Sequence, residues 1–136
     1  MNCETKHPLT QEALSQFTGD LDRYRHSLNR SAIFTPGVKF MADSGGAYWL
    51  VDAIASYLRP AYLKPLIERD PRIGELHFWK LTVAADRTAA LEARADSGEE
   101  PFIRQAIEYT DFPLASVDIW AAYDGTHWTL YLPSEH

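Results

Sequence analysis

The chain has 136 residues, of which 46% are hydrophobic and 24% charged, and its formal net charge is −6 at pH 7. These values are typical of one folded domain with its own core and exclude a disordered chain, and the acidic balance argues against general affinity for nucleic acid. The single cysteine, Cys3, excludes a disulfide framework within the chain, and no run reaches the roughly 18 apolar residues of a membrane span. We therefore expect one cytoplasmic domain over residues 1–136, without membrane contact.

The first predicted element is a short helix in the N-terminal segment, residues 1–20. Thr10 suits its N-cap, Leu9 and Leu14 have the spacing of a hydrophobic staple, and Gly19 suits the end of the helix. We expect this helix to lie as a lid on the main core.

An extended region begins at residue 22. The letters TPGV at 35–38 place proline and glycine at the second and third positions of a type II turn. We therefore predict a β-hairpin in which residues 31–34 pair with residues 38–42.

A helix over residues 44–59 is the element around which the chain is organised. Ser44 suits its N-cap, and Pro60 ends it because proline cannot supply the next helical N–H. At about 100° per residue, its apolar side chains fall within an arc of about 120°, which is typical of a helix packed on a sheet. These core-facing residues are Ala47, Leu50, Val51, Ile54, Tyr57 and Leu58. Trp49 lies on the opposite side, where solvent or a second layer should be.

The second half of the chain is rich in predicted strands. Residues 60–74 form a Pro-rich connector with one helical turn over 62–68. In the first strand, His77 shares the apolar side with Trp79, so we expect a core histidine. The five strands alternate apolar and polar side chains, and their bounds are 76–84, 88–96, 102–109, 117–123 and 127–132.

The last two strands meet at Asp124-Gly125, a sequence that favours a two-residue type I′ turn. This turn places Asp118 opposite Tyr131 and puts the apolar residues of both strands on one face. That face consists of Val117, Ile119, Ala121, Trp128, Leu130 and Leu132. We predict an α+β domain: a mainly antiparallel meander sheet with one central amphipathic helix packed on its apolar face and a short N-terminal helix.

No motif of known chemistry is present in the sequence. Gly45-Gly46 lacks the further glycines or lysine of a phosphate-binding loop, the histidines have no metal-ligand spacing, and no serine stands in a nucleophile elbow. We therefore expect no cofactor, no metal and no catalytic residue. Asp52, with Ser56 one turn later, leaves a hydrolase or transferase open as an interpretation.

Two aromatic groups are candidate partner-binding surfaces. The first is Tyr48, Trp49 and Asp52 on the far side of the central helix, and the second is Trp120 and Tyr131 on the outer face of the sheet. Aromatic side chains are enriched at protein interfaces. Each group also has a structural interpretation, in which other segments cover Trp49 and the sheet residues form a simple cross-strand patch.

A basic strip is the third candidate surface. It consists of Arg23, Arg25, Arg30 and Lys39. Such a strip suits phosphate contacts, with Tyr24 available for stacking on a base. Strand alternation weakens this interpretation, because it places Tyr24 on the face opposite its two arginine neighbours.

Six separated blocks carry a family resemblance: QFTG, YRHSLNRSAIFTPGVKF, GGAYWLVDAIAS, FWKLTV, IEYTDFPL and LPSEH. In these blocks, which run from about Thr10 to His136, the chain resembles a family of small proteins of bacterial plasmids, phages and other mobile elements, known as a domain of unknown function. The segment 60–74 departs from the family pattern by being longer. The resemblance implies a shared fold and a mobile-element setting, and it transfers no catalytic residue.

The leading hypothesis is a small non-catalytic binding protein of mobile-element origin that acts on a host protein, for example by inhibiting a defence system as anti-CRISPR proteins do. The alternative is a nucleic-acid or nucleotide-binding protein that uses the basic strip. A second alternative is a hydrolase or transferase. Binding through several phosphates weakens steeply as salt rises, which separates the first alternative from the leading hypothesis.

Overall fold

The computed structural model describes residues 9–18 and 22–136, so the expectations for Cys3 and Gly19 lie outside the described residues. Its helices are α1 (Gln11–Leu14), α2 (Pro36–Gly45), α3 (Tyr48–Tyr57) and α4 (Pro60–Arg69), with 3-10 turns η1 (Pro71–Gly74) and η2 (Pro133–Glu135). Its strands are β1 (Tyr24–Arg25), β2 (Ala32–Phe34), β3 (Leu76–Val83), β4 (Ala89–Arg94), β5 (Ile103–Ile107), β6 (Ser116–Tyr123) and β7 (Trp128–Tyr131). The predicted α+β class is confirmed.

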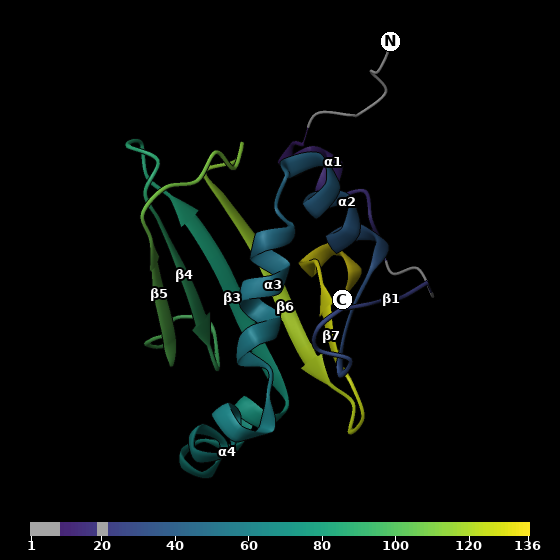
Figure 1. Ribbon diagram of the computed structural model, residues 1–136, viewed down its shortest axis with the longest axis vertical. Helices are drawn as coiled ribbons and strands as arrows, with labels where there is room; N and C mark the ends of the chain where they lie inside the picture. Colours follow the sequence, from purple (N-terminus) through teal and green to yellow (C-terminus); the bar gives the residue numbers. More distant parts are fainter. Residues whose placement is uncertain (1–8, 19–21) are drawn as a thin grey trace.

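The seven strands form one mixed sheet in the order β1-β2-β7-β6-β3-β4-β5. Neighbouring strands are antiparallel except β2 and β7, which run parallel. The sheet is therefore not the predicted meander, because β6 returns to pair with β3 and β2 pairs with β7. Helix α3 crosses in front of the sheet and α2 lies beside it (Figure 1), so the helical layer is larger than the one predicted helix.

Helix α2 replaces the hairpin predicted over residues 31–42. The Thr35 hydroxyl accepts a hydrogen bond from the Val38 N–H at 3.3 Å. Pro36 occupies the first helical position, where its missing N–H costs nothing. The helix ends at Gly46, whose φ of +61° is left-handed. The hairpin prediction is wrong because a threonine followed by proline caps a helix here.

Helix α3 begins later than predicted. Ser44 lies inside α2, and the N-cap of α3 is Ala47, whose side chain makes no capping hydrogen bond. The predicted core-facing stripe is confirmed, with Leu50 and Ile54 fully buried. The helix ends before Pro60, as predicted. Pro60 begins α4, which contains the predicted helical turn over 62–68 and continues through Pro65, so this part of the connector is more helical than predicted.

The N-terminal helix forms as predicted. The Thr10 hydroxyl accepts a hydrogen bond from the Ala13 N–H at 3.0 Å, which makes Thr10 the N-cap. Leu9 and Leu14 of the predicted staple are both buried and belong to the core. Just beyond the helix, the Phe17 ring packs against α2.

Strands β6 and β7 pair two residues away from the predicted register. Their loop is longer than two residues because the Asp124 carboxylate accepts hydrogen bonds from the N–H groups of Thr126 at 2.8 Å and His127 at 2.7 Å. Gly125 has a φ of +98°, whereas Asp124 keeps a negative φ, so the loop is not a type I′ turn. A shift of two residues preserves the alternation of faces, and all six predicted apolar residues remain buried.

His77 is a fully buried core histidine, as predicted. Its Nε2–H donates to the Ile73 carbonyl at 2.7 Å, and its Nδ1 accepts from the Trp79 indole N–H at 3.2 Å. Burial lowers the pKa of His77 to about 4, although the hydrogen bond to Ile73 acts in the opposite direction. The ring is therefore neutral at physiological pH and holds η1 against the sheet.

Glu135 ties the C-terminal turn to the start of α2. Its carboxylate accepts hydrogen bonds from the Thr35 hydroxyl at 2.6 Å, the Leu132 N–H at 2.9 Å and the Gly37 N–H at 3.2 Å. Glu135→Ala removes all three acceptors, so we expect it to lower the free energy of unfolding by about 1–2 kcal/mol. Glu135→Gln keeps one acceptor oxygen and should lose less. Urea unfolding followed by circular dichroism measures both, and a wild-type midpoint in Glu135→Ala would contradict the role.

Candidate functional site

The outer face of the sheet, which no described helix covers in Figure 1, carries a row of aromatic side chains. In the strand registers, Phe78 on β3 lies opposite Trp120 on β6, and Trp120 lies opposite Tyr131 on β7. Successive side chains of a strand point to opposite faces, and the neighbouring Ile119 and Leu130 are buried in the core. The three rings therefore lie on the face away from α3.

The rings of this row pack edge to face. The Phe78 and Trp120 centroids are 5.0 Å apart with an interplanar angle of 85°, and the Trp120 and Tyr131 centroids are 6.0 Å apart at 82°. The His136 ring stacks on Tyr131 at 14°, and its Nδ1 shares a 2.9 Å hydrogen bond with the Tyr131 hydroxyl. Burial raises the pKa of Tyr131, which keeps that hydroxyl neutral. We name Phe78, Trp120, Tyr131 and His136 the aromatic row.

A groove of about 810 Å³ runs beside the aromatic row. Strands β3, β4 and β6 supply most of its floor, and the loop after β4 supplies one wall. Its polar and charged lining residues are Lys80, Thr82, Glu92, Arg94, Ser97 and Asp118. The groove therefore combines an aromatic border with a mixed-charge floor.

The charged side chains of this groove are paired with one another. Glu92 accepts hydrogen bonds from Arg94 at 3.0 Å and pairs with Arg104 at 2.6 Å, and Lys80 lies 3.9 Å from Asp118. Glu92 and Arg94 are half-buried, whereas Arg104, Lys80 and Asp118 are exposed. Surface pairs contribute roughly 0–1 kcal/mol each, so they orient the side chains more than they stabilise the fold. The result is a groove floor of paired charges beside the aromatic row.

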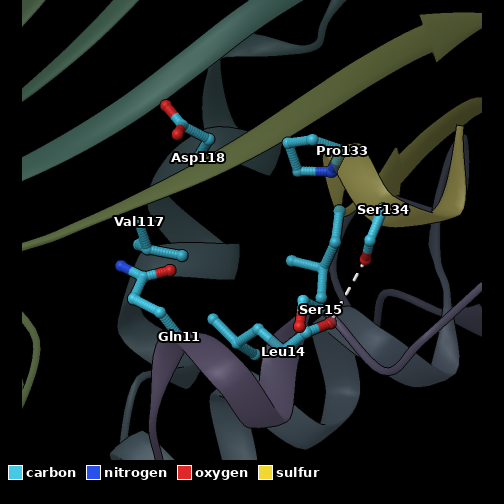
Figure 2. A pocket seen from close by; sticks show the side chains of 8 residues that line it. Gln11, Leu14, Ser15, Val117, Asp118, Pro133 and Ser134 are labelled. Carbon is cyan, nitrogen blue, oxygen red and sulfur yellow. Dashed lines mark hydrogen bonds between the residues drawn. The ribbon is translucent and has the colours of Figure 1, made fainter.

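A second hollow, of about 250 Å³, adjoins the groove because Asp118 and Pro133 line both. Figure 2 shows it between α1 and the C-terminal turn, with Leu14 and Val117 on its apolar side. The Ser134 hydroxyl donates a hydrogen bond to the Leu14 carbonyl at 3.2 Å, so the N-terminal helix is held as one wall. Leu14, Val117 and Leu132 of this lining belong to the core, so the second hollow borders the outer face without lying on it.

Comparison with known proteins places this chain in a family. The model of a family of unknown function, DUF6876, matches residues 8–136. The chain belongs to DUF6876. Neither the curated proteins nor the solved structures that were compared contain a match. Within residues 9–18 and 22–136, no helix has the length and apolar character to cross a membrane, and no cluster of three or more His, Cys, Asp or Glu could hold a metal ion.

Trp120 and Tyr131, the two predicted sheet-face residues of this DUF6876 chain, lie directly opposite each other. The predicted register had placed Asp118 opposite Tyr131, and the longer β6–β7 loop accounts for the difference. Trp120 is half-buried, whereas Tyr131 is buried because its ring is enclosed by its aromatic neighbours. Trp120 is therefore the more accessible ring of the pair.

The other predicted partner-binding residues lie on α3, on the opposite side of the molecule. The exposed Tyr48 donates a hydrogen bond from its hydroxyl to Asp43 at 2.6 Å. Burial is the larger cause of the raised pKa of Tyr48, and this hydrogen bond is the next. Trp49 is half-buried and packs against the core, between the two predicted outcomes of a capped and an exposed ring. The structure thus keeps this group separate from the aromatic row.

Asp52 contacts His26, a pairing that the sequence did not suggest. The His26 Nε2 lies 2.7 Å from the Asp52 carboxylate, and its Nδ1 accepts hydrogen bonds from the backbone N–H groups of Leu28 and Asn29. The ring proton is therefore on Nε2, and both nitrogens serve structural hydrogen bonds. The Ser56 hydroxyl donates to the backbone of its own helix. Among the described residues, no serine or cysteine joins the pair as a nucleophile.

The predicted basic strip does not form one surface. Lys39 lies on the helix side, with its Nζ 5.5 Å from the Tyr24 ring centre. Arg25 follows Tyr24 in β1 and so points to the other face of the sheet. Arg30 is exposed in the turn before β2, and Arg23 borders a hollow at the end of the aromatic row. Only part of the strip therefore approaches the candidate site.

Two members of the aromatic row were not predicted. Strand alternation contains the signal for Phe78, because His77 and Trp79 on either side of it face the core. No sequence signal identifies His136, whose place in the row depends on the hydrogen bonds of η2. The groove depends in the same way on the strand order, which brings β4 and β6 to either side of β3.

Proposed function

We propose that the DUF6876 chain is a small non-catalytic binding protein that docks another protein on the outer face of its sheet. The observation that carries the proposal is the aromatic row beside the 810 Å³ groove, on a face without a helical cover. Tryptophan, tyrosine and arginine are the side chains most enriched among residues that dominate binding energy. A partner would pack apolar side chains on the aromatic row, while the paired charges of the groove would meet its polar groups.

Nucleic acid fits this face less well than protein does. The rings of the row meet edge to face, which gives no parallel platform for successive bases. Arg94 and Arg104 both pair with Glu92, so their charge is partly neutralised before any phosphate arrives. The formal net charge of −6 adds long-range repulsion.

The setting of the partner is a further part of this proposal. The six sequence blocks that resemble proteins of plasmids and phages support a mobile-element origin. A partner supplied by the bacterial host follows from that origin, and a defence protein inhibited in the manner of anti-CRISPR proteins is its most concrete form. The chain then acts by occupying a surface rather than by turnover.

Replacing Trp120 tests the proposal. A partner retained from host lysate is purified, and its affinity for wild type and for Trp120→Ala is measured by calorimetry. Because Trp120 is the half-buried centre of the row, we expect a loss of about 30-fold or more, corresponding to a hot spot of about 2 kcal/mol. Thermal melting of the variant checks that the fold persists.

Tyr62→Ala is the matched control, since it removes an exposed aromatic ring on α4, away from the aromatic row. It should bind the partner with wild-type affinity. The proposal is wrong if Trp120→Ala binds as tightly as wild type, or if the lysate yields only nucleic acid with a steep salt dependence.

A further inference from the structure

A third hollow, independent of the sheet-face site, lies where the end of α3, helix α4 and the β6–β7 strands meet. Its volume is about 160 Å³. Its apolar lining residues are Leu58, Pro60, Leu63, Ile67, Tyr123 and Trp128. Ser31 and Gly74 complete the wall, so no charged side chain lines it.

The size of this hollow suits one six-membered ring. An engineered cavity of about 150 Å³, lined by Leu, Ile and Phe in another protein, stays dry and binds benzene. Leu58 and Leu63 are buried at the base of the hollow, whereas Ser31, Pro60 and Tyr123 are exposed. An apolar molecule can therefore enter from solvent without unfolding the chain.

The residues of this wall carry three polar side-chain groups: the exposed Ser31 hydroxyl, the Tyr123 hydroxyl, which donates to the Gly125 carbonyl at 3.1 Å, and the indole N–H of Trp128. Trp128 is only 5% exposed, and among the described residues no acceptor receives a hydrogen bond from its Nε1. The other deeply buried tryptophan, Trp79, does have an acceptor, the Nδ1 of His77 at 3.2 Å. A buried donor without a partner costs roughly 1–3 kcal/mol, so a ligand that supplies an acceptor recovers that cost.

We propose that this hollow is a binding site for a small uncharged molecule of about one ring, which carries one hydrogen-bond acceptor such as a carbonyl oxygen. The apolar wall selects the ring, and the indole N–H of Trp128 selects the acceptor. The absence of charged groups from the lining excludes ionised ligands, because nothing there would compensate their desolvation. This site lies apart from the aromatic row and does not depend on the protein-docking proposal.

Titration of the ¹⁵N-labelled protein with cyclohexanone and with methylenecyclohexane tests the site. The two molecules have nearly the same shape, but only the ketone has an acceptor oxygen. Of the four tryptophan indole signals, the one lost in Trp128→Phe identifies Trp128. We expect a saturable shift of that signal with cyclohexanone, and an affinity several-fold weaker for methylenecyclohexane.

Filling variants locate the binding. Ile67→Phe occupies the hollow and should abolish the saturable shift, whereas Ile67→Val leaves the space open and should retain it. Gly74→Ala is a second filling variant, because its added Cβ would lie 3.4 Å from Ile67 without a clash. The proposal is overturned if the Trp128 signal does not saturate, if both filling variants bind like wild type, or if the two ring molecules bind equally well.

Discussion

Lowering the pH from 7 to 4 is expected to remove about 3 kcal/mol of folding free energy through His77. Burial lowers the pKa of this ring from its ordinary 6.5 to about 4 in the folded chain. Below pH 6.5, His77 becomes protonated in the unfolded chain, whereas in the folded chain it stays neutral until the pH falls to about 4. The contribution of the neutral ring is therefore fully present above pH 6.5 and is lost progressively across this window.

Urea unfolding at several pH values between 4 and 7 measures this loss. His77→Gln retains a donor for the Ile73 carbonyl but does not titrate, so its stability should depend on pH less steeply than that of wild type. His127→Gln, at a half-buried position in the β6–β7 loop, controls for the replacement of an imidazole. If the unfolding free energy of His77→Gln falls with pH as steeply as that of wild type, the buried neutral ring does not cause the loss of stability.

Two carboxylates, Asp70 and Glu99, make the folding stability depend on pH in a still lower range. Hydrogen bonds from Arg72 lower the pKa of Asp70 below its ordinary 3.8 and that of Glu99 below its ordinary 4.5. Their contribution is present above these ordinary values and is lost as the pH falls through the lowered ones. The window assigned to His77 lies mainly above this range, so the two effects separate along the pH axis.

Asn29→Ala is expected to destabilise the fold by about 3 kcal/mol, because the buried Asn29 amide donates hydrogen bonds to carbonyls at the C-terminal end of α3. The Asn29 Nδ2 donates to the carbonyls of Ala55 at 2.9 Å and Leu58 at 3.0 Å, and its Oδ1 accepts from the Ser31 N–H at 3.0 Å. The side chain is 5% exposed, so water cannot replace these partners without local opening. Truncation removes the side-chain partner of the Leu58 carbonyl and of the Ser31 N–H, while the Ala55 carbonyl keeps its hydrogen bond from the Leu58 N–H at 3.1 Å.

Two further variants distinguish this role from simple loss of packing. Asn29→Asp has the same shape but aims a carboxylate at two carbonyl oxygens, so it should destabilise at least as much as Asn29→Ala. Ser27→Ala changes an exposed residue of the same turn and should stay within about 0.5 kcal/mol of wild type. If Asn29→Asp unfolds at the same urea concentration as wild type, the hydrogen bonds of the amide to the end of α3 do not stabilise the fold.

The strands of the second half could be predicted because each has one buried face. In β4, for example, Leu91 and Ala93 are fully buried, while Glu92 between them lines the groove. The alternation of apolar and polar residues predicts this arrangement. The same parity correctly placed Trp120 and Tyr131 on the outer face. The predicted pairing of the two strands was wrong because hydrogen bonds to the Asp124 side chain stabilise a longer loop. A shift of two residues leaves each side chain on the same face, so the alternation of apolar and polar residues cannot reveal it.

The first half was harder to predict because local signals there have two interpretations. Thr35-Pro36 suits the start of a helix as well as a turn, and the apolar residues after it pack on the core in either case. Partners far apart in sequence complete the site. The hydrogen bond from His26 to Asp52 and the place of His136 in the aromatic row both depend on tertiary structure, for which no spacing rule exists.

The parallel pairing of β2 with β7 has a consequence for how the chain folds. These strands lie near opposite ends of the sequence, and Ile33 meets Thr129 only after nearly all of the chain is available. Such a non-local contact raises the contact order, which slows folding because the intervening loop must close before the pairing contributes. During synthesis, one edge of β2 therefore stays unpaired until β7 has left the ribosome. That interval, rather than the finished structure, is when the chain is most exposed to misassociation.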